Sequence, residues 1–192
     1  MKNKLIIYSL LFVFCSGCTP ILKLFYGVHE PKAEDSISLR KYYGKKGINT
    51  NNMLVLSDSI KYKARFKEVG GFPEIRVFNK EGYLVYHKDT TVSCNGPAYE
   101  FTESICKVSN LKVNPDKKLN DEINCLLTLD KSPLLLSSDE VFDYYVFIYC
   151  ARFLGRLNKD HVKVWENNLK HVTGCKVKYY KVDMDWQKSW DQ

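Results

Sequence analysis

The sequence lacks the short patterns that most directly assign a chemistry to a protein. It has no serine-histidine-aspartate order, no phosphate-binding glycine loop and no internal repeat. Beyond residue 18 there are five cysteines, and no two of them have a C-x-x-C or another zinc-ligand spacing. Their odd number also argues against a complete disulfide framework, so at least one thiol should be free.

A long apolar run is absent as well. Residues 5–14 (LIIYSLLFVF) are too few to span a bilayer, but they follow a short basic head and have the length of a signal-peptide core. The run leads into Cys15-Ser16-Gly17-Cys18, the one C-x-x-C of the chain. A catalytic C-x-x-C follows a buried strand and opens a helix, whose N-terminus lowers the thiol pKa. The position of this pair therefore indicates export and not redox chemistry.

The residues Ser16-Gly17-Cys18 resemble the lipobox of bacterial lipoproteins, in which small residues precede a cysteine that is diacylated and becomes the mature N-terminus. The resemblance implies a signal peptide at residues 1–17 and a lipid anchor on Cys18. It also implies a cell-envelope location, either on the periplasmic side of a membrane or on the cell surface. Cys15 departs from the pattern, because this position usually holds Leu or another aliphatic residue. An ordinary secretory peptide or an uncleaved anchor is the alternative.

Arginine-rich blocks are missing too. The formal net charge is +7, and it falls to +5 when Lys2 and Lys4 leave with the signal. The charge is spread over single lysines, which indicates a solvated surface, with attraction to anionic headgroups near the anchor as the alternative. We expect no nucleic-acid partner for an exported protein of this kind.

The chain beyond the signal has the length of one domain with a sizeable core. Residues 18–34 have two prolines and no sustained period, which predicts a tether, and residues 35–192 should form a single domain. Residues 37–43 predict a short helix and residues 53–56 a strand. Residues 60–67 alternate like a strand with one basic face, but capping residues on both sides favour a helix.

The second half of the chain contains clearer strand and helix patterns. Residues 74–78 and 83–88 predict a hairpin around the polar turn Asn79-Lys80-Glu81-Gly82, followed by a helix. The connector at residues 109–140 should hold a helix around residues 119–129. The apolar run at residues 144–149 is typical of a strand buried on both faces. We expect Asn158 to cap the next helix and residues 177–182 to form the returning strand. The two strands should be parallel neighbours, because a right-handed crossover is the favoured way to join them, and the hairpin should lie antiparallel in the same sheet.

Two of these pieces resemble thioredoxin-like domains. Phe72-Pro73-Glu74 and the hairpin after it are similar to the proline-led hairpin of that family, and Pro73 matches its cis-proline. VFIYCARFLGRLNKDHVKVWENNL, with KVKYYKVDMDW after it, resembles the family's strand, active-site turn, helix and strand. The two pieces cover somewhat more than half of the chain beyond the signal. The resemblance implies an α/β fold with a thioredoxin-like mixed sheet flanked by helices, and a groove for substrate chains beside Pro73, Phe153 and Gly155.

The departures from the family concern both order and chemistry. The hairpin precedes the strand-helix-strand unit, so the sheet is either circularly permuted or unpermuted with a long insertion and the hairpin as an N-terminal extension. Arg152-Phe153-Leu154-Gly155-Arg156 stands where the family has its cysteine pair, so both family cysteines are missing. Disulfide exchange needs a thiolate of low pKa and a second thiol that resolves the mixed disulfide.

Two cysteines remain candidates for a reactive thiol. Cys150 ends a buried strand, where burial raises a thiol pKa, so we interpret it as a core residue. Cys94 lies close to a helix N-terminus, a better setting for a thiolate, and could pair with Cys106. Asp183 and Asp185 could hold a cation with His161 or His171, but solvated carboxylates at a sheet edge are the better interpretation, so we predict no metal and no cofactor.

Two hypotheses follow from these observations. The first is a membrane-anchored, non-catalytic thioredoxin-like lipoprotein that binds an envelope protein or peptide. The second is a thiol-disulfide oxidoreductase or peroxidase that uses a relocated cysteine, Cys94 or Cys150. The missing cysteine pair favours the first hypothesis.

Overall fold

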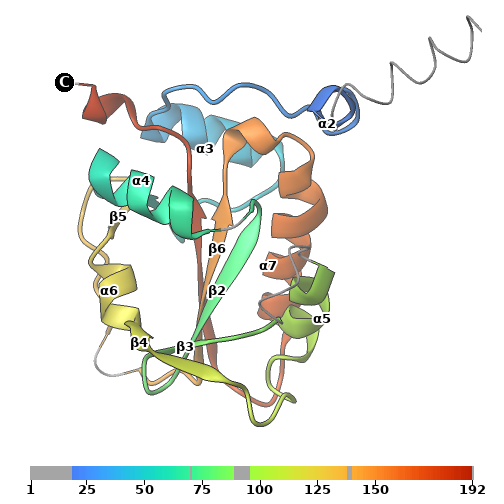
Figure 1. Ribbon diagram of the computed structural model, residues 1–192, viewed down its shortest axis with the longest axis vertical. Helices are drawn as coiled ribbons and strands as arrows, with labels where there is room; N and C mark the ends of the chain where they lie inside the picture. The colour runs from blue at the N-terminus through green and yellow to red at the C-terminus, as the bar shows by residue number, and fades with distance from the viewer. Residues whose placement is uncertain (1–18, 70, 89–95, 138–139, 192) are drawn as a thin grey trace, which may run out of the picture.

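The computed structural model describes residues 19–69, 71–88, 96–137 and 140–191. Seven strands in these residues form one mixed sheet in the order β4-β3-β2-β6-β7-β1-β5. Helices cover both faces of this sheet (Figure 1). The predicted α/β class, with a mixed sheet flanked by helices, is confirmed. Cys15, Cys18 and Cys94 lie outside the described residues.

The central strands have the directions that the sequence predicts. β6 (Tyr144–Cys150) is parallel to β7 (Val177–Asp183), and β2 (Glu74–Asn79) is antiparallel to both β6 and β3 (Tyr83–Val85). The hairpin therefore belongs to the same sheet as the strand-helix-strand unit, as predicted. β1 (Met53–Leu56) lies parallel to β7 on its other side.

Burial along β6 explains why this strand is central. Each residue after Tyr144 is buried, and successive side chains enter opposite cores. Val146, Ile148 and Cys150 join one core, whereas Tyr145, Phe147 and Tyr149 join the other. A strand that is apolar on both faces needs cover on both sides, which the helices provide.

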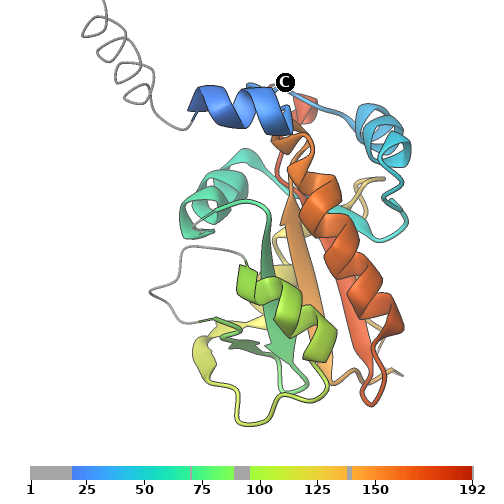
Figure 2. The same ribbon diagram turned by 90° about the vertical axis from the view of Figure 1, so that its right-hand side faces the viewer.

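The helices divide between the two faces of the sheet (Figure 2). Side chains of α3 (Ser36–Lys45), α5 (Gly96–Ser104) and α7 (Lys163–His171) pack into the first core. Side chains of α4 (Ser59–Glu68) and α6 (Leu119–Ile123) lie against the second. The π-helical turn η2 (Asn158–Val162) runs into α7, and η1 (Arg152–Leu154) precedes it.

Residues 60–67, which could form a strand or a helix from their sequence, lie in a helix, α4. Asp58 accepts a hydrogen bond from the backbone N–H of Lys61 at 2.7 Å, which satisfies one of the free amides of the first turn. Asp35 caps α3 in the same way, through the backbone N–H of Ser38 at 2.8 Å. The capping residues thus decide the structure here, and the prediction of a helix is confirmed.

The connector at residues 109–140 differs from expectation. The helix predicted around residues 119–129 ends at Ile123, and Leu126–Thr128 forms β5, an edge strand antiparallel to β1. A further strand, β4 (Val113–Lys118), pairs with β3. The predicted cap Asn158 is also wrong, because Asn158 is buried and its Nδ2 donates to the carbonyl of Ala151 at 2.7 Å.

Cys106 forms a disulfide with Cys175, with the two Cα atoms 5.4 Å apart. The bond joins the segment after α5 to the segment before β7. The pairing of Cys106 with Cys94 that the sequence allows is therefore wrong. Cys125 and Cys150 are free thiols. The odd number of cysteines beyond residue 18 predicted that at least one of the five would be free.

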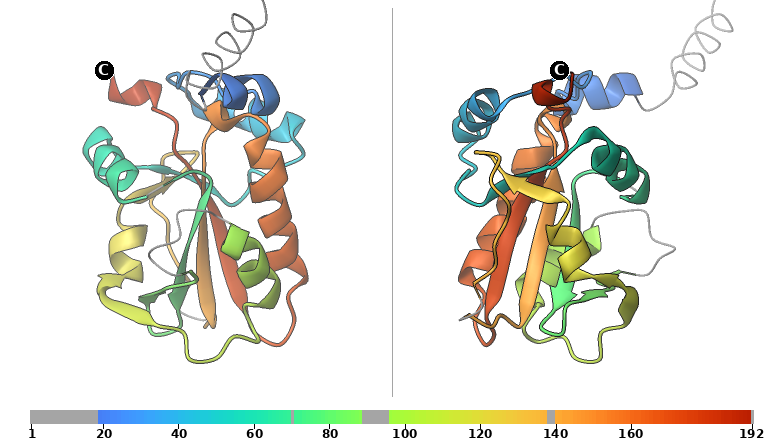
Figure 3. Two further views of the ribbon diagram at one scale, coloured as in Figure 1. Left: turned by 45° about the vertical axis from the view of Figure 1, so that its right-hand side comes forward. Right: turned by 90° about the vertical axis from the view of Figure 1, so that its left-hand side faces the viewer.

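The elements near the chain ends gather at one end of the molecule. α2 (Thr19–Tyr26), α3, α4 and the C-terminal turn η3 (Lys188–Trp190) lie there, whereas the β2–β3 turn and β4 lie at the opposite end (Figure 3). Among the described residues, none of the helices is long and apolar enough to cross a membrane.

Candidate functional site

The turn after β6 is where the resemblance places an active site. β6 ends at Cys150, η1 follows, and the turn closes at Gly155, which has a φ of +59°. β2 begins opposite this point, because Glu74 pairs with Tyr149. The peptide bond between Phe72 and Pro73 is cis, and Pro73 is buried. The predicted groove residues Pro73, Phe153 and Gly155 therefore lie at the same end of the sheet.

Part of the predicted tether covers this turn. The backbone N–H of Arg156 donates to the carbonyl of Tyr26 at 2.7 Å, and that of His29 donates to the carbonyl of Phe153 at 2.9 Å. A Cβ atom at Gly155 would lie only 2.2 Å from the carbonyl oxygen of Tyr26. Glycine is thus required by both its φ and this close approach. The flank of the groove beside Phe153 and Gly155 is filled by the chain itself.

The free thiols are poorly placed for exchange chemistry. Cys150 is fully buried, with the hydroxyl of Tyr43 3.4 Å from its Sγ. Burial, reinforced by the charge of Asp183, raises the pKa of the Cys150 thiol far above its usual range. Cys125 is half-buried and its Sγ donates to the carbonyl of Asp121 at 3.1 Å. Burial also raises the pKa of the Cys125 thiol. Neither residue is activated as a thiolate.

Asp183 and Asp185 are buried, so the prediction of solvated carboxylates at a sheet edge is wrong. β7 lies between β6 and β1 and is not an edge strand. The hydroxyl of Tyr43 donates to Asp183 Oδ2 at 2.7 Å, and the backbone N–H of Arg152 donates to Asp185 Oδ2. Burial, and then the neighbouring Asp185, raises the pKa of Asp183, and burial raises the pKa of Asp185 to about 6.

Arg152 links this buried pair to the segment that covers the turn. Its Nη1 lies 2.6 Å and 2.7 Å from the two carboxylate oxygens of Glu34. Glu34 is buried and is joined to the C-terminal segment by a backbone bridge to Gln187. Arg152 in the turn after β6 thus has a structural partner.

A second group of buried charges lies on the other face of the sheet. Glu122 is buried and is within 2.8 Å of Arg65 and 3.2 Å of Arg76. The hydroxyl of Tyr149 donates to the same carboxylate. Burial raises the pKa of Glu122 despite the two guanidinium groups. For its neighbour Glu68 burial is outweighed by the hydrogen bond from Lys117 and the charges of Arg76 and Arg65, which lower the pKa to about 2. The ion pairs connect α4, β2 and α6.

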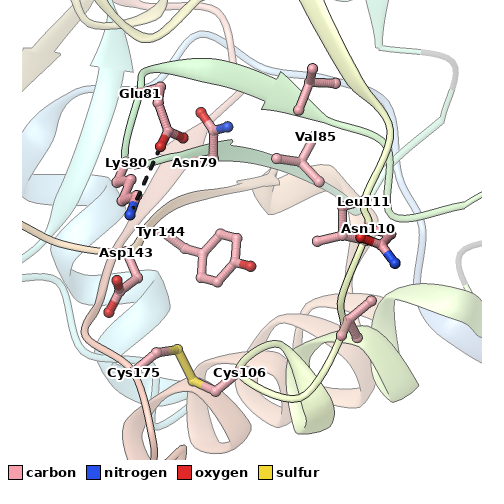
Figure 4. A pocket seen from close by; sticks show the side chains of 12 residues that line it. Asn79, Lys80, Glu81, Val85, Cys106, Asn110, Leu111, Asp143, Tyr144 and Cys175 are labelled. Atoms are coloured by element: carbon pink, nitrogen blue, oxygen red, sulfur yellow. Dashed lines mark ion pairs between the residues drawn. A yellow bond between two sulfur atoms is a disulfide. The ribbon is translucent and has the colours of Figure 1, made fainter.

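A cavity of about 410 Å³ opens at the opposite end of the sheet from Pro73 (Figure 4). It lies between the β2–β3 turn and the Cys106–Cys175 disulfide, with the ring of Tyr144 pointing into it. Polar groups of Asn79, Glu81 and Asp143 line one part, and Val85 and Leu111 line another. Its volume lies within the range of small-ligand pockets. Sequence analysis missed this cavity, although its polar rim is the predicted hairpin turn.

No group of His, Cys, Asp and Glu side chains in the described part of the chain has the geometry to hold a metal ion. His171 lies on α7 and its Nδ1 is 2.8 Å from the carbonyl of Asn167, away from the two aspartates. The ring of His161 lies beside that of Trp165, 5.6 Å between ring centroids and tilted by 43°.

The chain was compared with protein-family models, with curated proteins and with solved structures, and no match was found in any of the three.

Proposed function

We propose that this chain is an exported bacterial lipoprotein, anchored through Cys18, whose thioredoxin-like domain has lost thiol chemistry and binds an envelope protein or peptide. The observation that carries the proposal is the turn after β6. It presents Arg152 and Gly155 in place of a cysteine pair, and residues 26–29 of the chain cover it. Such a turn offers no thiolate to attack a disulfide or a peroxide.

The arrangement of the sheet supports a thioredoxin-like domain in permuted order. The hairpin comes first in the chain, yet β2 pairs with β6 over six residue pairs. A hairpin in a separate domain with a core of its own would not make this contact. The cis bond before Pro73 and the helix α5 after the hairpin agree with the family pattern.

The disulfide between Cys106 and Cys175 is consistent with export, because disulfides persist in oxidising compartments and are rare in the cytosol. The same compartment is implied by the lipobox-like residues Ser16-Gly17-Cys18. Two separate features of the sequence thus favour an envelope location.

The cavity beside the disulfide is the binding site that we propose for the partner. The groove flank at Phe153 and Gly155 is filled by residues 26–29, whereas the cavity is open and lies at the far end from α2. Asn79 and Asn110 at its rim carry amide groups that can bond to a peptide backbone. Its apolar wall beside Leu111 can accept a side chain.

Metabolic labelling with a fatty acid, combined with membrane fractionation, tests the anchor. The wild type should incorporate label and stay with membranes, and Cys18→Ala should do neither. Cys15→Ala should change little, because Cys15 leaves with the signal. Label that persists in Cys18→Ala would instead support an ordinary secreted or signal-anchored protein.

Insulin reduction and peroxide reduction test the loss of thiol chemistry. We expect no turnover by the wild type. Turnover that disappears in Cys94→Ser or Cys150→Ser would support the oxidoreductase hypothesis instead.

Photo-crosslinking tests the binding site in the cavity. A photo-crosslinking residue at Leu111 should capture a discrete envelope partner, and the same residue at exposed Leu135 should not. Equal capture at both positions would contradict a site in the cavity.

A further inference from the structure

Three helices at one end of the molecule carry a net positive charge. α2, α3 and α4 together contain eight lysine and arginine residues and one acidic residue, Glu68. Their net charge of +7 leaves −2 for the rest of the chain from Cys18 on, whose total is +5. The chain is therefore mildly basic as a whole, and these three helices hold its excess of basic residues. Lys23, Arg40 and Arg65 are paired with acidic residues outside these three helices, whereas Lys61, Lys63 and Lys67 on α4 are exposed.

The same three helices expose apolar side chains. Among the described residues eleven large hydrophobic side chains are exposed, and six of these belong to α2, α3 and α4: Leu24, Phe25, Tyr26, Ile37, Ile60 and Phe66. Leu24 is 80% exposed, Ile37 78% and Ile60 77%. Single exposed apolar residues are ordinary, but their concentration beside lysines at one end is not.

Five rings form a connected aromatic cluster at this end. Its members are joined by ring contacts of 5.1 to 5.8 Å between centroids. They come from α4, from the residue before Pro73 and from the C-terminal segment: Tyr62, Phe66, Phe72, Trp186 and Trp190. None of the five is fully buried. The Nζ of Lys63 lies 5.9 Å from the ring centre of Trp186. The cluster therefore combines partly exposed tryptophans with an adjacent cation.

The proposed lipid anchor on Cys18 would be attached at this end of the molecule. Cys18 directly precedes Thr19, the first residue of α2, and consecutive Cα atoms are about 3.8 Å apart. α2 has eight residues, so it spans about 12 Å. Tyr26, the last residue of α2, and His29, just after the helix, are hydrogen-bonded to the body of the domain. A lipid on Cys18 thus holds this end, and no other, close to the bilayer.

We infer that α2, α3, α4 and the aromatic cluster form a membrane-contact surface that rests on anionic lipid headgroups. This inference rests on the proposed anchor at Cys18. Tryptophan and tyrosine favour the interface between headgroups and acyl chains, and lysines are attracted to anionic lipids. Contact on this surface fixes the orientation of the domain and turns the cavity beside the disulfide away from the membrane.

Tryptophan fluorescence tests the contact directly. Trp186 and Trp190 belong to the surface, and the third tryptophan, Trp165, is 1% exposed in the core. The lipidated protein is placed in vesicles of phosphatidylglycerol and brominated phosphatidylcholine in equal parts. We expect bromine to quench its fluorescence, and high salt to reduce the quenching while the protein stays anchored. The double variant with Trp186→Phe and Trp190→Phe should show no quenching.

Charge reversal provides a matched pair of variants. Lys61→Glu, Lys63→Glu and Lys67→Glu are combined in α4. The control combines Lys80→Glu, Lys107→Glu and Lys112→Glu, which change the charge equally at exposed positions in or next to the lining of the cavity at the opposite end. The α4 variant should weaken docking about 100-fold, because each basic residue near an anionic surface contributes attraction of about 1 kcal/mol. The control should be quenched like the wild type.

The outcomes separate this inference from the proposed function. Protein that carries label and floats with vesicles but is not quenched keeps its anchor and overturns the membrane-contact surface. Equal loss of quenching in both triple variants also overturns the membrane-contact surface. So does a partner protein that shields the two tryptophans when lipid does not quench them. Absence of fatty-acid label, which is measured independently, contradicts the anchor itself.

Discussion

The thiol of Cys150 is enclosed by Tyr43 and the carbonyl of Val182, at 3.4 Å and 3.6 Å from its Sγ. Because burial raises its pKa, the folded protein at pH 8 should leave Cys150 unmodified by iodoacetamide. Cys125, which is half-buried, should react orders of magnitude faster. Mass spectrometry of each site over time measures both rates. Rapid native modification of Cys150 would contradict the structure, and modification in urea provides the control.

Asp185 should make the stability of the protein depend on pH. Its pKa is about 6 in the folded state, above the usual value of 3.8, so the folded state binds more protons between these values. The contribution of Asp185 to the free energy of unfolding therefore falls as the pH rises from about 4 to 6. Asp185→Asn removes this effect, and its amide oxygen can still accept from Arg152.

We expect Asp185→Asn to be more stable than the wild type at pH 8, by at most about 3 kcal/mol, and equally stable near pH 4. Urea denaturation at the two pH values measures the difference. The exposed Asp116→Asn should behave like the wild type at both. A variant that is destabilised equally at pH 4 and pH 8 would show that the carboxylate is needed for packing and not merely tolerated.

The burial of charged side chains was the property predicted least well from the sequence. The alternation of Asp183 and Asp185 indicated that the two carboxylates lie close together, and the backbone N–H of Asp185 donates to Asp183 Oδ1 at 3.0 Å, although β7 ends at Asp183. Their burial depends on segments distant in the chain that cover the end of β7. The hydroxyl of Tyr43 in α3 donates to Asp183, and the backbone N–H of Arg152 donates to Asp185. β7 also carries Lys181, fully buried beside Glu166 at 2.8 Å. A local pattern cannot report a partner that is distant in sequence.

At the scale of elements, the contact between residues 26–29 and the turn after β6 depends on Gly155. Gly155→Ala places a Cβ 2.2 Å from the carbonyl oxygen of Tyr26 and strains a backbone with φ of +59°. We expect a loss of about 2 kcal/mol in stability. The released segment should also become a substrate for trypsin at Lys23 and Lys32, as followed by mass spectrometry.

Gly44→Ala is the control for this change. Gly44 lies within α3, and a Cβ there would meet no atom within 4 Å. Alanine is the better helix former, so this variant should be stabilised by about 0.5 to 1 kcal/mol and should resist trypsin like the wild type. Unchanged proteolysis in Gly155→Ala would mean that residues 26–29 do not depend on the turn.

Elements with a strong local signal were predicted well. The hairpin turn, the apolar run of β6 and the capped helices α3 and α4 all appear near their predicted residues. The connector at residues 109–140 was predicted poorly, because Leu126 belongs to a strand only by pairing with β1. The predicted groove residues do lie at one end of the sheet, but their cover by Tyr26 and His29 required the tertiary structure.

At the scale of the whole molecule, the Cys106–Cys175 disulfide closes a loop with a sequence separation of 69 residues. Reduction, or Cys106→Ser with Cys175→Ser, should lower the free energy of unfolding by at most about 4 kcal/mol, because the unfolded chain regains the entropy of the loop. Urea denaturation with and without reductant measures the change. Cys125→Ser, which removes a free thiol, is the control and should not respond to reductant differently from the wild type.

The sequence predicted the class of the fold and the placement of the hairpin in the main sheet. It left open whether the order of elements reflects permutation or insertion, because strand pairing over long distances is absent from local patterns. The cavity beside the disulfide was also beyond prediction, since it is lined by segments from the hairpin, the α5 connector and the start of β6.

The pairing of Glu34 with Gln187 has a mechanical consequence. The backbone of Glu34 bonds to Trp186 and Lys188 at 2.7 Å and 2.9 Å, and Lys188 Nζ lies 2.6 Å from Asp35. If Cys18 is anchored as we propose, a pull on the body of the domain is first transmitted to the bonds of Tyr26 and His29 and then to this junction. The sheet itself lies behind both, so tension extends the linker between anchor and domain before it reaches the core.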